Sequence, residues 1–313
     1  MVDTETLAKA AEIIRRGGLV AFPTETVYGL GANALDAAAV ARIYEVKNRP
    51  RTSPLIVHVD SDGMARQLAL EWPEAATVLS RRFWPGPLTL VVPKRPHIPD
   101  IVTAGLSTVG IRVPAHPVAL ALIREAGLPL AAPSANPFTQ LSPTTAAHVR
   151  ESLGDRVELV LDGGPSEVGI ESTVLSLASV PPRLLRPGMV SREDIEALIG
   201  PVAVAGRIED DGAHESPGRH AKHYSPRTPL VLVDGGRLPA GRGAYLYIRR
   251  PARAARSIAM PAEPVEYAAR LYGVLHGQDA EGWDWIAVEE PPAAAEWAAV
   301  RDRLERAAGA SDR

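Results

Sequence analysis

Along the first 200 residues, apolar positions recur either at helical spacing or in short continuous runs. Residues 4–18, "TETLAKAAEIIRRGG", predict a helix with Thr4 or Thr6 as the N-cap and two glycines as the stop signal. The uniformly apolar run 19–22 then predicts a buried strand. The same contrast predicts further helices at 36–49, 61–70, 74–83, 117–126, 144–154 and 192–200, and strands at 54–59, 87–93, 108–114, 129–136, 157–164 and 172–178. Because helices and strands intermix without strict alternation, we expect an α/β fold with a mixed sheet.

Residues 201–228 break this pattern, because they combine proline, glycine and charge without apolar periodicity. The stretch is longer than an ordinary loop, so we interpret it as a disordered or functional linker. Beyond it the pattern predicts strands at 229–236, 243–250 and 283–291 and helices at 264–277 and 293–308, which form a small βαβ-like unit. The sequence therefore predicts two domains, 1–200 and 229–313, joined by the linker 201–228.

Composition narrows the classes of function. The chain is 46% hydrophobic and 23% charged with a net charge of −3, which is not the strongly basic footprint of a nucleic-acid-binding protein. It has no apolar run long enough to span a membrane, and its N-terminus lacks the basic start and apolar centre of a signal peptide. The absence of cysteine excludes disulfides, thiolate nucleophiles and metals held by cysteine. We therefore expect a cytoplasmic protein that contacts no membrane.

Polar residues gather where the predicted strands end. The segment 22–31, "FPTETVYGLG", places two threonines and a glutamate directly after a buried strand, where they either turn the chain or present hydroxyls to a pocket. The segment 47–59, "KNRPRTSPLIVHV", carries three cations and Ser53 off the end of a helix. These cations suit the helix dipole, and equally a polyphosphate site, since arginine donates a planar fork to phosphate. His58, taken alone, is typical of a buried strand histidine.

Arg112 lies between two apolar residues of the predicted strand "STVGIRVP", 107–114. A buried charge must be paired, because leaving it bare is costly. Its partner is either a carboxylate of the protein or the carboxylate of a ligand. Thr108 lies four residues earlier on the same side of the strand, which favours a shared pocket wall.

Three more segments place short polar groups or a cation at strand ends. Small residues in 131–145, "AAPSANPFTQLSPTT", allow the backbone to approach a ligand closely, and a helix start follows that favours an anion. The segments 169–177, "GIESTVLSL", and 184–188, "LLRPG", add hydroxyls and an arginine. Turn and cap chemistry explains each residue separately. Together the clusters are typical of a small-molecule site at the strand ends of an open α/β sheet, here for a ligand with phosphates and a carboxylate.

Signatures of other chemistries are absent. The chain contains no GxxxxGK[ST] loop and no GxSxG elbow, and "GLGANA" lacks the third glycine of a dinucleotide fingerprint. His220 and His223, with His214 nearby, have a spacing found in metal sites. Without cysteines or an acidic partner, we interpret them as solvated linker histidines.

These motifs resemble the YrdC-like family of threonylcarbamoyl-AMP synthases. The resemblance covers roughly residues 5–200, and the linker "SPGRHAKHYSP" and C-terminal unit resemble the longer, two-domain branch. It implies a twisted mixed α/β sheet around a large basic cavity, with a small Rossmann-like C-terminal domain. The matching segments, in family order, are "FPTETVYGLG", "KNRP…SPLIVHV", "WPGPLTLVV", "STVGIRVP", "APSAN", "LSPT", "GIESTV" and "LLRPG".

The resemblance implies an L-threonylcarbamoyladenylate synthase, a nucleotidyltransferase. Such an enzyme converts L-threonine, bicarbonate and ATP into L-threonylcarbamoyl-AMP, pyrophosphate and water. Its product passes to a tRNA threonylcarbamoyl-transferase complex, and weak or transient contact with tRNA is compatible with this role. An RNA-binding module with a basic cavity is the alternative. Mg²⁺ is expected to arrive with ATP and to be held through phosphate oxygens, since no protein carboxylate cage is evident.

The resemblance also assigns roles to individual residues, with Arg112 on the threonine carboxylate. The linker is expected to close over the cavity as a lid that brings Tyr224 to the nucleotide, with Lys222 beside it. The residues implied for threonine are Thr26, His58, Arg112, Ser172 and the backbone of Ala132. Those implied for ATP are Arg49, Ser53, Thr108, Ser134, Ser142, Arg186 and Tyr224, with Lys47 and Asn136 helping with the phosphates.

Overall fold

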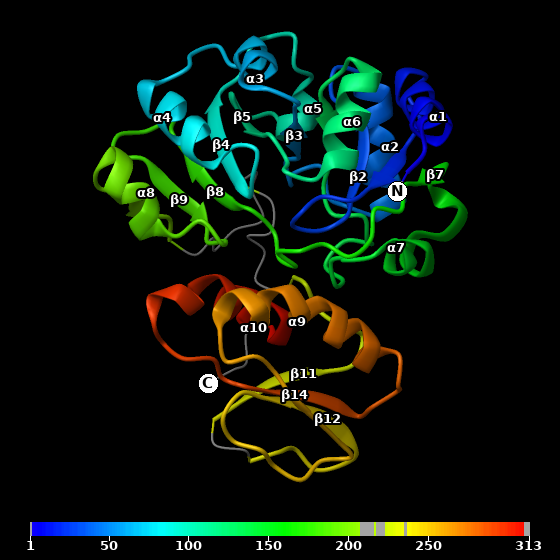
Figure 1. Ribbon diagram of the computed structural model, residues 1–313, viewed down its shortest axis with the longest axis vertical. Helices are drawn as coiled ribbons and strands as arrows, with labels where there is room; N and C mark the ends of the chain where they lie inside the picture. Colours follow the sequence, from blue (N-terminus) through cyan, green and yellow to red (C-terminus); the bar gives the residue numbers. More distant parts are fainter. Residues whose placement is uncertain (1, 207–215, 217–222, 235–236, 310–313) are drawn as a thin grey trace.

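The computed structural model describes residues 2–206, 216, 223–234 and 237–309, which form two sheets flanked by helices (Figure 1). Within these residues the larger sheet has ten strands and the smaller has four. No helix of this part of the chain is long and apolar enough to cross a membrane.

The larger unit is built from the described residues up to 206, so it includes the start of the segment predicted as a linker. Its helices are α1 (Thr4–Arg15), α2 (Ala37–Lys47), α3 (Asp62–Leu68), α4 (Glu74–Phe83), α5 (Asp100–Thr103), α6 (Pro117–Ala126), α7 (Ala146–Leu153) and α8 (Arg192–Ile199), with the 3-10 turn η1 (Gly154–Arg156). Its strands are β1 (Val20–Phe22), β2 (Gly29–Asn33), β3 (Ile56–His58), β4 (Leu88–Pro93), β5 (Thr108–Arg112), β6 (Leu130–Ala131), β7 (Leu159–Val160), β8 (Thr173–Ser176), β9 (Arg183–Arg186) and β10 (Ala203–Val204).

The larger sheet is mixed, as the sequence predicts. Its strand order is β10-β9-β8-β4-β5-β3-β6-β2-β1-β7. β3 and β5 run parallel, and His58 lies opposite Arg112 in their register. β4 and β8 are also parallel, whereas β5 pairs antiparallel with β4. Parallel pairing therefore brings the polar ends of β3 and β5 to the same edge of the sheet.

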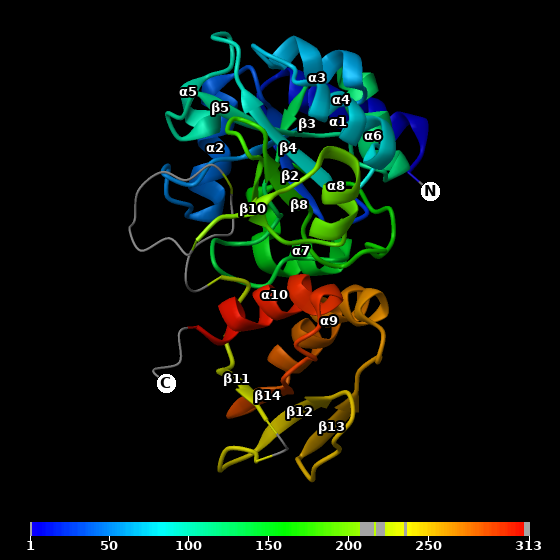
Figure 2. The same cartoon turned by 90° about the vertical axis from the view of Figure 1, so that its left-hand side faces the viewer.

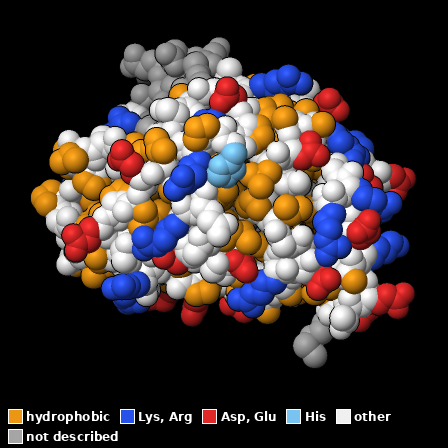
Figure 3. All heavy atoms as spheres, turned by 90° about the horizontal axis from the view of Figure 1, so that it is seen from above, with side chains coloured by type: hydrophobic (Ala, Val, Ile, Leu, Met, Phe, Trp, Pro, Cys, Tyr) orange, Lys and Arg blue, Asp and Glu red, His pale blue; other side chains and the backbone are white. Residues whose placement is uncertain are grey.

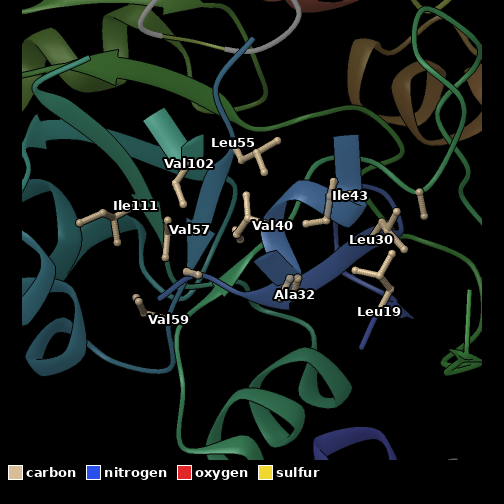
Figure 4. Packing of buried hydrophobic residues seen from close by; sticks show 14 of the residues in the cluster. Leu19, Leu30, Ala32, Val40, Ile43, Leu55, Val57, Val59, Val102 and Ile111 are labelled. Carbon is tan, nitrogen blue, oxygen red and sulfur yellow. The ribbon is translucent and has the colours of Figure 1, made fainter. Parts of the chain in front are cut away.

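Successive residues of the first strand pack against opposite layers, as the two-residue period of a strand requires. Val20 and Phe22 pack with α1 and α6. Leu19 and Ala21 belong instead to the cluster that contains α2, where Leu19, Leu30, Val40 and Ile43 lie together (Figure 4). Both faces of this half of the sheet are therefore covered, which accounts for its uniformly apolar strands.

The smaller sheet contains β11 (Leu230–Val233), β12 (Gly243–Tyr247), β13 (Arg256–Ala259) and β14 (Trp285–Glu289). All of its strands are parallel, in the order β11-β14-β12-β13. Two helices, α9 (Pro264–Asp279) and α10 (Ala298–Ala308), lie between this sheet and the larger unit, with the 3-10 turn η2 (Ala295–Trp297) before α10 (Figures 1 and 2). The expected small parallel α/β unit is confirmed.

The sequence pattern missed several elements. It gave no strand at β2, β9, β10 or β13 and no helix at α5. β2 was not predicted because its glycines have low strand propensity. Gly31 is nevertheless required at its position, since a Cβ there would lie 2.6 Å from the ring of Phe22. β10 pairs with β9, so the segment predicted as linker begins inside the sheet. The first helix is capped by Asp3, not by a threonine.

The two units share one apolar interface. Val27, Leu141 and Ile170 of the larger unit belong to the same buried cluster as α9 and α10. Gly169 has a φ of 76°, and a Cβ there would lie 2.5 Å from the carbonyl oxygen of Ala268, so only glycine permits this approach. The contact between the units is therefore close-packed at the backbone level.

A pair of stacked histidines crosses the same interface. The rings of His148 on α7 and His276 on α9 lie 3.9 Å apart at an interplanar angle of 15°. His276 Nε2 also lies 3.1 Å from the carbonyl oxygen of Ser142. Burial, together with the neighbouring ring, lowers the pKa of His148 to about 4, and burial lowers the pKa of His276. Both rings are therefore neutral at neutral pH.

Acidification is expected to weaken this interface. Unfolded histidines titrate near 6.5, so the unfolded chain binds more protons as the pH falls. The stabilising contribution of neutral His148 is full above about pH 6.5 and is lost as the pH falls from there towards its folded pKa of about 4. We expect the fall in melting temperature between about pH 7.5 and about pH 5 to be about 2 °C smaller in His148→Asn than in the unchanged protein.

Glu151 and Asp279 face these rings and raise their pKa values, but less than burial lowers them. Differential scanning fluorimetry across the pH range measures the effect. His97→Asn, at an exposed histidine, serves as the control and should follow the unchanged protein. Identical pH profiles for His148→Asn and the unchanged protein would contradict the expectation.

Candidate functional site

A cavity lies at the ends of β3, β5 and β9 and beside the turn after β1. The parallel pair β3 and β5 brings His58 and Arg112 to it, and the segment before β8 brings Ser172. Its lining residues are Thr24, Thr26, Val27, Gly29, Arg49, Pro54, Leu55, Ile56, His58, Arg112, Ala132, Pro133, Ser134, Glu171, Ser172, Arg186, His223 and Tyr224.

One end of the cavity is organised around Arg112, which is 3% exposed. Its Nη2 lies 2.6 Å from Oε1 of Glu25, and its Nη1 donates a hydrogen bond of 2.9 Å to the hydroxyl of Thr26. The second carboxylate oxygen of Glu25 accepts the backbone N–H of Ala115 at 3.0 Å. The pairing required for a buried charge is thus supplied by the protein itself. Glu25, which the sequence did not assign, is the partner.

The turn before this end presents one threonine to the cavity and uses another internally. The hydroxyl of Thr24 donates to the carbonyl oxygen of Val27 at 2.6 Å and lies 2.8 Å from that of Thr26. Thr24 therefore fixes the turn, while Thr26 connects it to Arg112. Both interpretations of the opening motif, a turn and a pocket wall, are correct.

His58 contributes a neutral polar ring beside Arg112. Burial, with the charge of Arg112 adding to it, lowers the pKa of His58 to about 3. Its Nδ1 has no hydrogen-bond partner within the described part of the chain. The residue lines the cavity, so its neutral ring forms part of the wall beside Arg112.

The other end of the cavity holds two more arginines. Arg186 donates from Nε to the carbonyl oxygen of Ser172 at 3.0 Å, and from Nη2 to its hydroxyl at 3.2 Å. Arg49 donates to the Ser53 hydroxyl at 2.5 Å and to the carbonyl oxygen of Pro54 at 2.9 Å. Burial lowers the pKa of Arg49 to about 10, and the like charge of Arg186 contributes to this.

Arg49 is therefore still a cation at neutral pH, and it is 7% exposed. Among the described residues it forms no ion pair, in contrast to Arg112. Its partners are neutral oxygens and the ring of Phe138, whose centroid lies 5.4 Å from its guanidinium. A buried cation without a counterion at a cavity wall favours an anionic ligand.

Tyr224, from the far end of the predicted linker, forms part of the cavity wall. It is 1% exposed, has a φ of 59°, and its hydroxyl lies 3.5 Å from Nη1 of Arg186. His223 is also buried, packed against the rings of Phe138 and Tyr224, so its interpretation as a solvated linker histidine is wrong. His214, His220 and Lys222 lie outside the described residues.

Five residues predicted for ATP do not line this cavity. Lys47 is 1% exposed and donates to the carbonyl oxygens of Ser134 and Asn136, while burial, with the charge of Arg49, holds its pKa well below the usual range. Ser53 lies behind Arg49. The Asn136 amide donates to the carbonyl oxygens of Pro137 and Gln140, and the Ser142 hydroxyl donates to Glu171 at 2.6 Å. Thr108 lines a smaller neighbouring cavity.

The smaller cavity shares Pro54, Leu55 and Ile56 with the main one, so Thr108 and Arg112 lie in adjoining spaces. All five residues predicted for threonine do line the main cavity, as do Arg49, Ser134, Arg186 and Tyr224 from the ATP set. Sequence reasoning brought nine of the lining residues together. It gave no role to Glu25 or Glu171, because their partners are distant in sequence.

Protein ligands for a metal are not gathered at this site. Within the described residues no group of three His, Asp or Glu side chains could hold a metal ion. Glu171 is the one carboxylate among the described lining residues. The donor set consists of hydroxyls and cations, which suits an anionic ligand that carries its own cation.

Two family models together match most of the chain. The model of the Sua5/YciO/YrdC family, described as "Telomere recombination", matches residues 12–188. A second model, described as "Threonylcarbamoyl-AMP synthase, C-terminal domain", matches residues 190–309.

Relatives match along nearly the whole chain. The threonylcarbamoyl-AMP synthase of Bacillus subtilis (strain 168) is 44% identical, covering 97% of this chain and 93% of its own. That of Pyrococcus abyssi (strain GE5 / Orsay) is 43% identical, covering 96% of this chain and 93% of its own. A crystal structure of P. abyssi Sua5 complexed with L-threonine has a TM-score of 0.93 at 39% identity, covering 98% of this chain and 95% of that chain.

Removing the carboxylate of Glu25 is expected to destabilise the fold. Glu25→Ala leaves the Arg112 charge buried without its partner and removes the acceptor of the Ala115 N–H. We expect the free energy of unfolding to fall by about 3 kcal/mol, as for other broken buried ion pairs. A urea titration followed by circular dichroism measures the change.

Glu12→Ala is the matched control, because Glu12 pairs with Arg15 and Arg16 on the exposed side of α1. It should change the free energy of unfolding by no more than about 0.5 kcal/mol. An equally small change for Glu25→Ala would show that the Arg112 charge does not depend on this carboxylate.

Proposed function

The chain belongs to the Sua5/YciO/YrdC family, in the form that carries a threonylcarbamoyl-AMP synthase C-terminal domain, and we infer that it synthesises L-threonylcarbamoyl-AMP. L-threonine, bicarbonate and ATP are consumed, and pyrophosphate is released. The observation that carries this conclusion is the likeness to synthases along nearly the whole length of both chains. It decides between the two functions that the sequence left open, in favour of the synthase.

The alternative of an RNA-binding module gains no support from the face shown in Figure 3. On the face of the larger unit that lies farthest from the smaller sheet, lysine and arginine side chains are interspersed with acidic and hydrophobic ones (Figure 3). A dominant RNA interface would be expected to concentrate positive charge.

We assign the Arg112 end of the cavity to threonine. The guanidinium of Arg112, already oriented by Glu25 and Thr26, is the group best suited to the threonine carboxylate. The neutral ring of His58 lines the cavity and adds no charge that would repel the threonine ammonium. Ala132 and Ser172 complete this part of the wall.

The Arg49 end is assigned to the triphosphate of ATP. Arg49 has no counterion within the described part of the chain, and Arg186 is close enough for its charge to affect the pKa of Arg49. Two neighbouring arginines can neutralise phosphate oxygens with their planar donor forks. Ser134 and Tyr224 lie on the same wall and are assigned to the nucleotide.

The ATP-binding assignment keeps five residues that do not line the main cavity, but in a supporting role: Lys47, Ser53, Thr108, Asn136 and Ser142. Lys47 and Asn136 hold the backbone of the loop that carries Ser134. Ser53 orients Arg49 through a hydrogen bond of 2.5 Å. We propose that they shape the phosphate-binding wall and that any direct contact with ATP follows closure over the substrate.

The chemistry fits a site made of charges and hydroxyls. The threonine amine loses a proton and takes up the carbon of bicarbonate with loss of water. An oxygen of the resulting N-carboxylate then attacks the α-phosphorus of ATP, and pyrophosphate leaves. Such a transfer depends on positioning and on neutralising phosphate charge, so no protein nucleophile is required.

Mg²⁺ is proposed to enter with ATP. The lining residues offer cations and hydroxyls rather than a carboxylate cage, so the ion would be held by phosphate oxygens and water. When bound, it would screen the charge of the leaving pyrophosphate. Arg49 and Arg186 would contact the remaining phosphate oxygens.

The further fate of the product is also proposed from family membership. The labile mixed anhydride would be used by a tRNA threonylcarbamoyl-transferase complex, with any direct tRNA contact of this protein weak and transient. A cytoplasmic location follows from tRNA as the final acceptor. The division at residues 200 and 229, with the intervening segment as a lid, is proposed on the same grounds.

The purified protein is expected to release pyrophosphate from ATP and Mg²⁺ only when threonine is added, and faster with bicarbonate. A coupled pyrophosphate assay measures this. Arg112→Ala should raise the KM for threonine at least about tenfold, since a charge-assisted pair with the carboxylate is lost, with a much smaller effect on the KM for ATP.

Arg124→Ala serves as the control, because Arg124 is exposed and its only close carboxylate, Asp60, lies 3.9 Å away among the described residues. No threonine-dependent pyrophosphate from the unchanged protein would refute the function. An unchanged KM for threonine in Arg112→Ala would refute the role of Arg112 and leave the function standing.

A further inference from the structure

Arg303 is a fully buried charge on the side of α10 that faces the larger unit. The other buried residues of this helix are apolar: Ala299, Val300, Leu304 and Ala307. The arginine thus occupies a position that helical spacing would normally give to an apolar side chain. Burial acts to lower its pKa, but the charges of Glu171 and Asp302 help to outweigh burial and raise the pKa above the ordinary value.

Every nitrogen of this guanidinium donates a hydrogen bond. Nε donates to Oε2 of Glu171 at 2.7 Å, and Nη2 donates to the carbonyl oxygen of the same residue at 3.2 Å. Nη1 donates to the carbonyl oxygen of Pro187 at 3.0 Å and to Asp302 at 2.7 Å. The centroid of the Tyr224 ring lies 5.4 Å from the guanidinium carbon.

Three of these partners belong to segments that form the cavity. Glu171 lines the cavity and directly precedes Ser172. Pro187 directly follows Arg186. Tyr224 lines the cavity itself. One side chain of the C-terminal unit therefore contacts three segments that are far apart in the sequence, each with a residue assigned to a substrate.

We propose that Arg303 is a positioning residue for adenylate formation, which holds Ser172, Arg186 and Tyr224 in their places on the cavity wall. This inference rests on the proposed function. Arg303 does not line the cavity, so it acts through its neighbours rather than on the substrate. The C-terminal unit thereby becomes a structural component of the site.

Arg303 also sets the charge of the cavity wall. Glu171 is 7% exposed and is the one carboxylate among the described residues that line the cavity. Without a partner, its charge would repel the triphosphate near Arg186. The ion pair of 2.7 Å neutralises it, while the Ser142 hydroxyl and the Tyr272 hydroxyl, 3.2 Å away, bond the same carboxylate.

Lysine cannot reproduce this arrangement. A guanidinium reaches a carboxylate, two carbonyl oxygens and an aromatic face at once because it is planar and carries five donors. A lysine ammonium is a single point on a flexible chain, so it can keep the charge opposite Glu171 but not the bonds to both carbonyls. Arg303→Lys and Arg303→Met therefore separate the charge from the geometry.

The test measures the KM for ATP and kcat in the pyrophosphate assay with the full chain. We expect Arg303→Met to raise the KM for ATP by about tenfold or more, from the loss of charge-assisted hydrogen bonds. Arg303→Lys should give a smaller rise. Adding Glu171→Gln to Arg303→Met should recover part of the loss, because it removes the unpaired carboxylate. Arg301→Met, on the same helix but away from the cavity, should behave as the unchanged protein.

A role in stability alone would reduce the amount of active enzyme, so that kcat falls while the KM for ATP stays unchanged. That result for Arg303→Met, or for Arg303→Lys where Arg303→Met does not fold, overturns the proposal. Calorimetric titration with α,β-methylene-ATP measures nucleotide binding without turnover, so it tests the positioning role of Arg303 separately from the proposed function. Weaker binding by the Arg303 variants supports the positioning role even if no product is formed, and equal binding overturns it.

Discussion

Compensation of buried positive charge is the constraint on which this structure depends. Five cationic side chains are at most 7% exposed: Lys47, Arg49, Arg112, Arg186 and Arg303. Each needs nearby oxygens, because an uncompensated ion in the interior is costly. Arg112 and Arg303 have carboxylates, in Glu25 and Glu171. Lys47 has backbone carbonyls, and Arg49 has neutral oxygens and an aromatic ring. Among the described residues, Arg112 therefore faces the cavity with a carboxylate partner, whereas Arg49 faces it with neutral partners only.

This distribution suits a substrate pair that differs in charge. A single amino-acid carboxylate needs an oriented donor more than an excess of positive charge, and in our proposal Arg112, held by Glu25, is that donor. A triphosphate needs net positive charge, and in the same proposal Arg49 provides it. The C-terminal unit also contributes to the cavity wall. Its helices pack against the segment before β8, and Arg303 of this unit bonds Glu171 there. Both units and the interface between them thus contribute to the cavity.

Much of this could be predicted from the sequence, where the signal is local. Buried strands, capped helices and the need to pair Arg112 follow from patterns within a few residues, and the five residues that the resemblance implies for threonine all line the cavity. The partners themselves could not be predicted, because Arg303 and Glu171 are 132 positions apart and only the fold brings them together. A detectable signal was a charged residue on the apolar stripe of the last helix. β2 was missed because close packing on Phe22, not strand propensity, selects its glycines.

A crystal structure with threonine and α,β-methylene-ATP bound tests the division of the cavity most directly. The threonine carboxylate should lie within hydrogen-bonding distance of Arg112, and the phosphates should contact Arg49 and Arg186, with Glu171 still paired to Arg303. Phosphates bound at Arg112, or a triphosphate outside this cavity, would contradict the account.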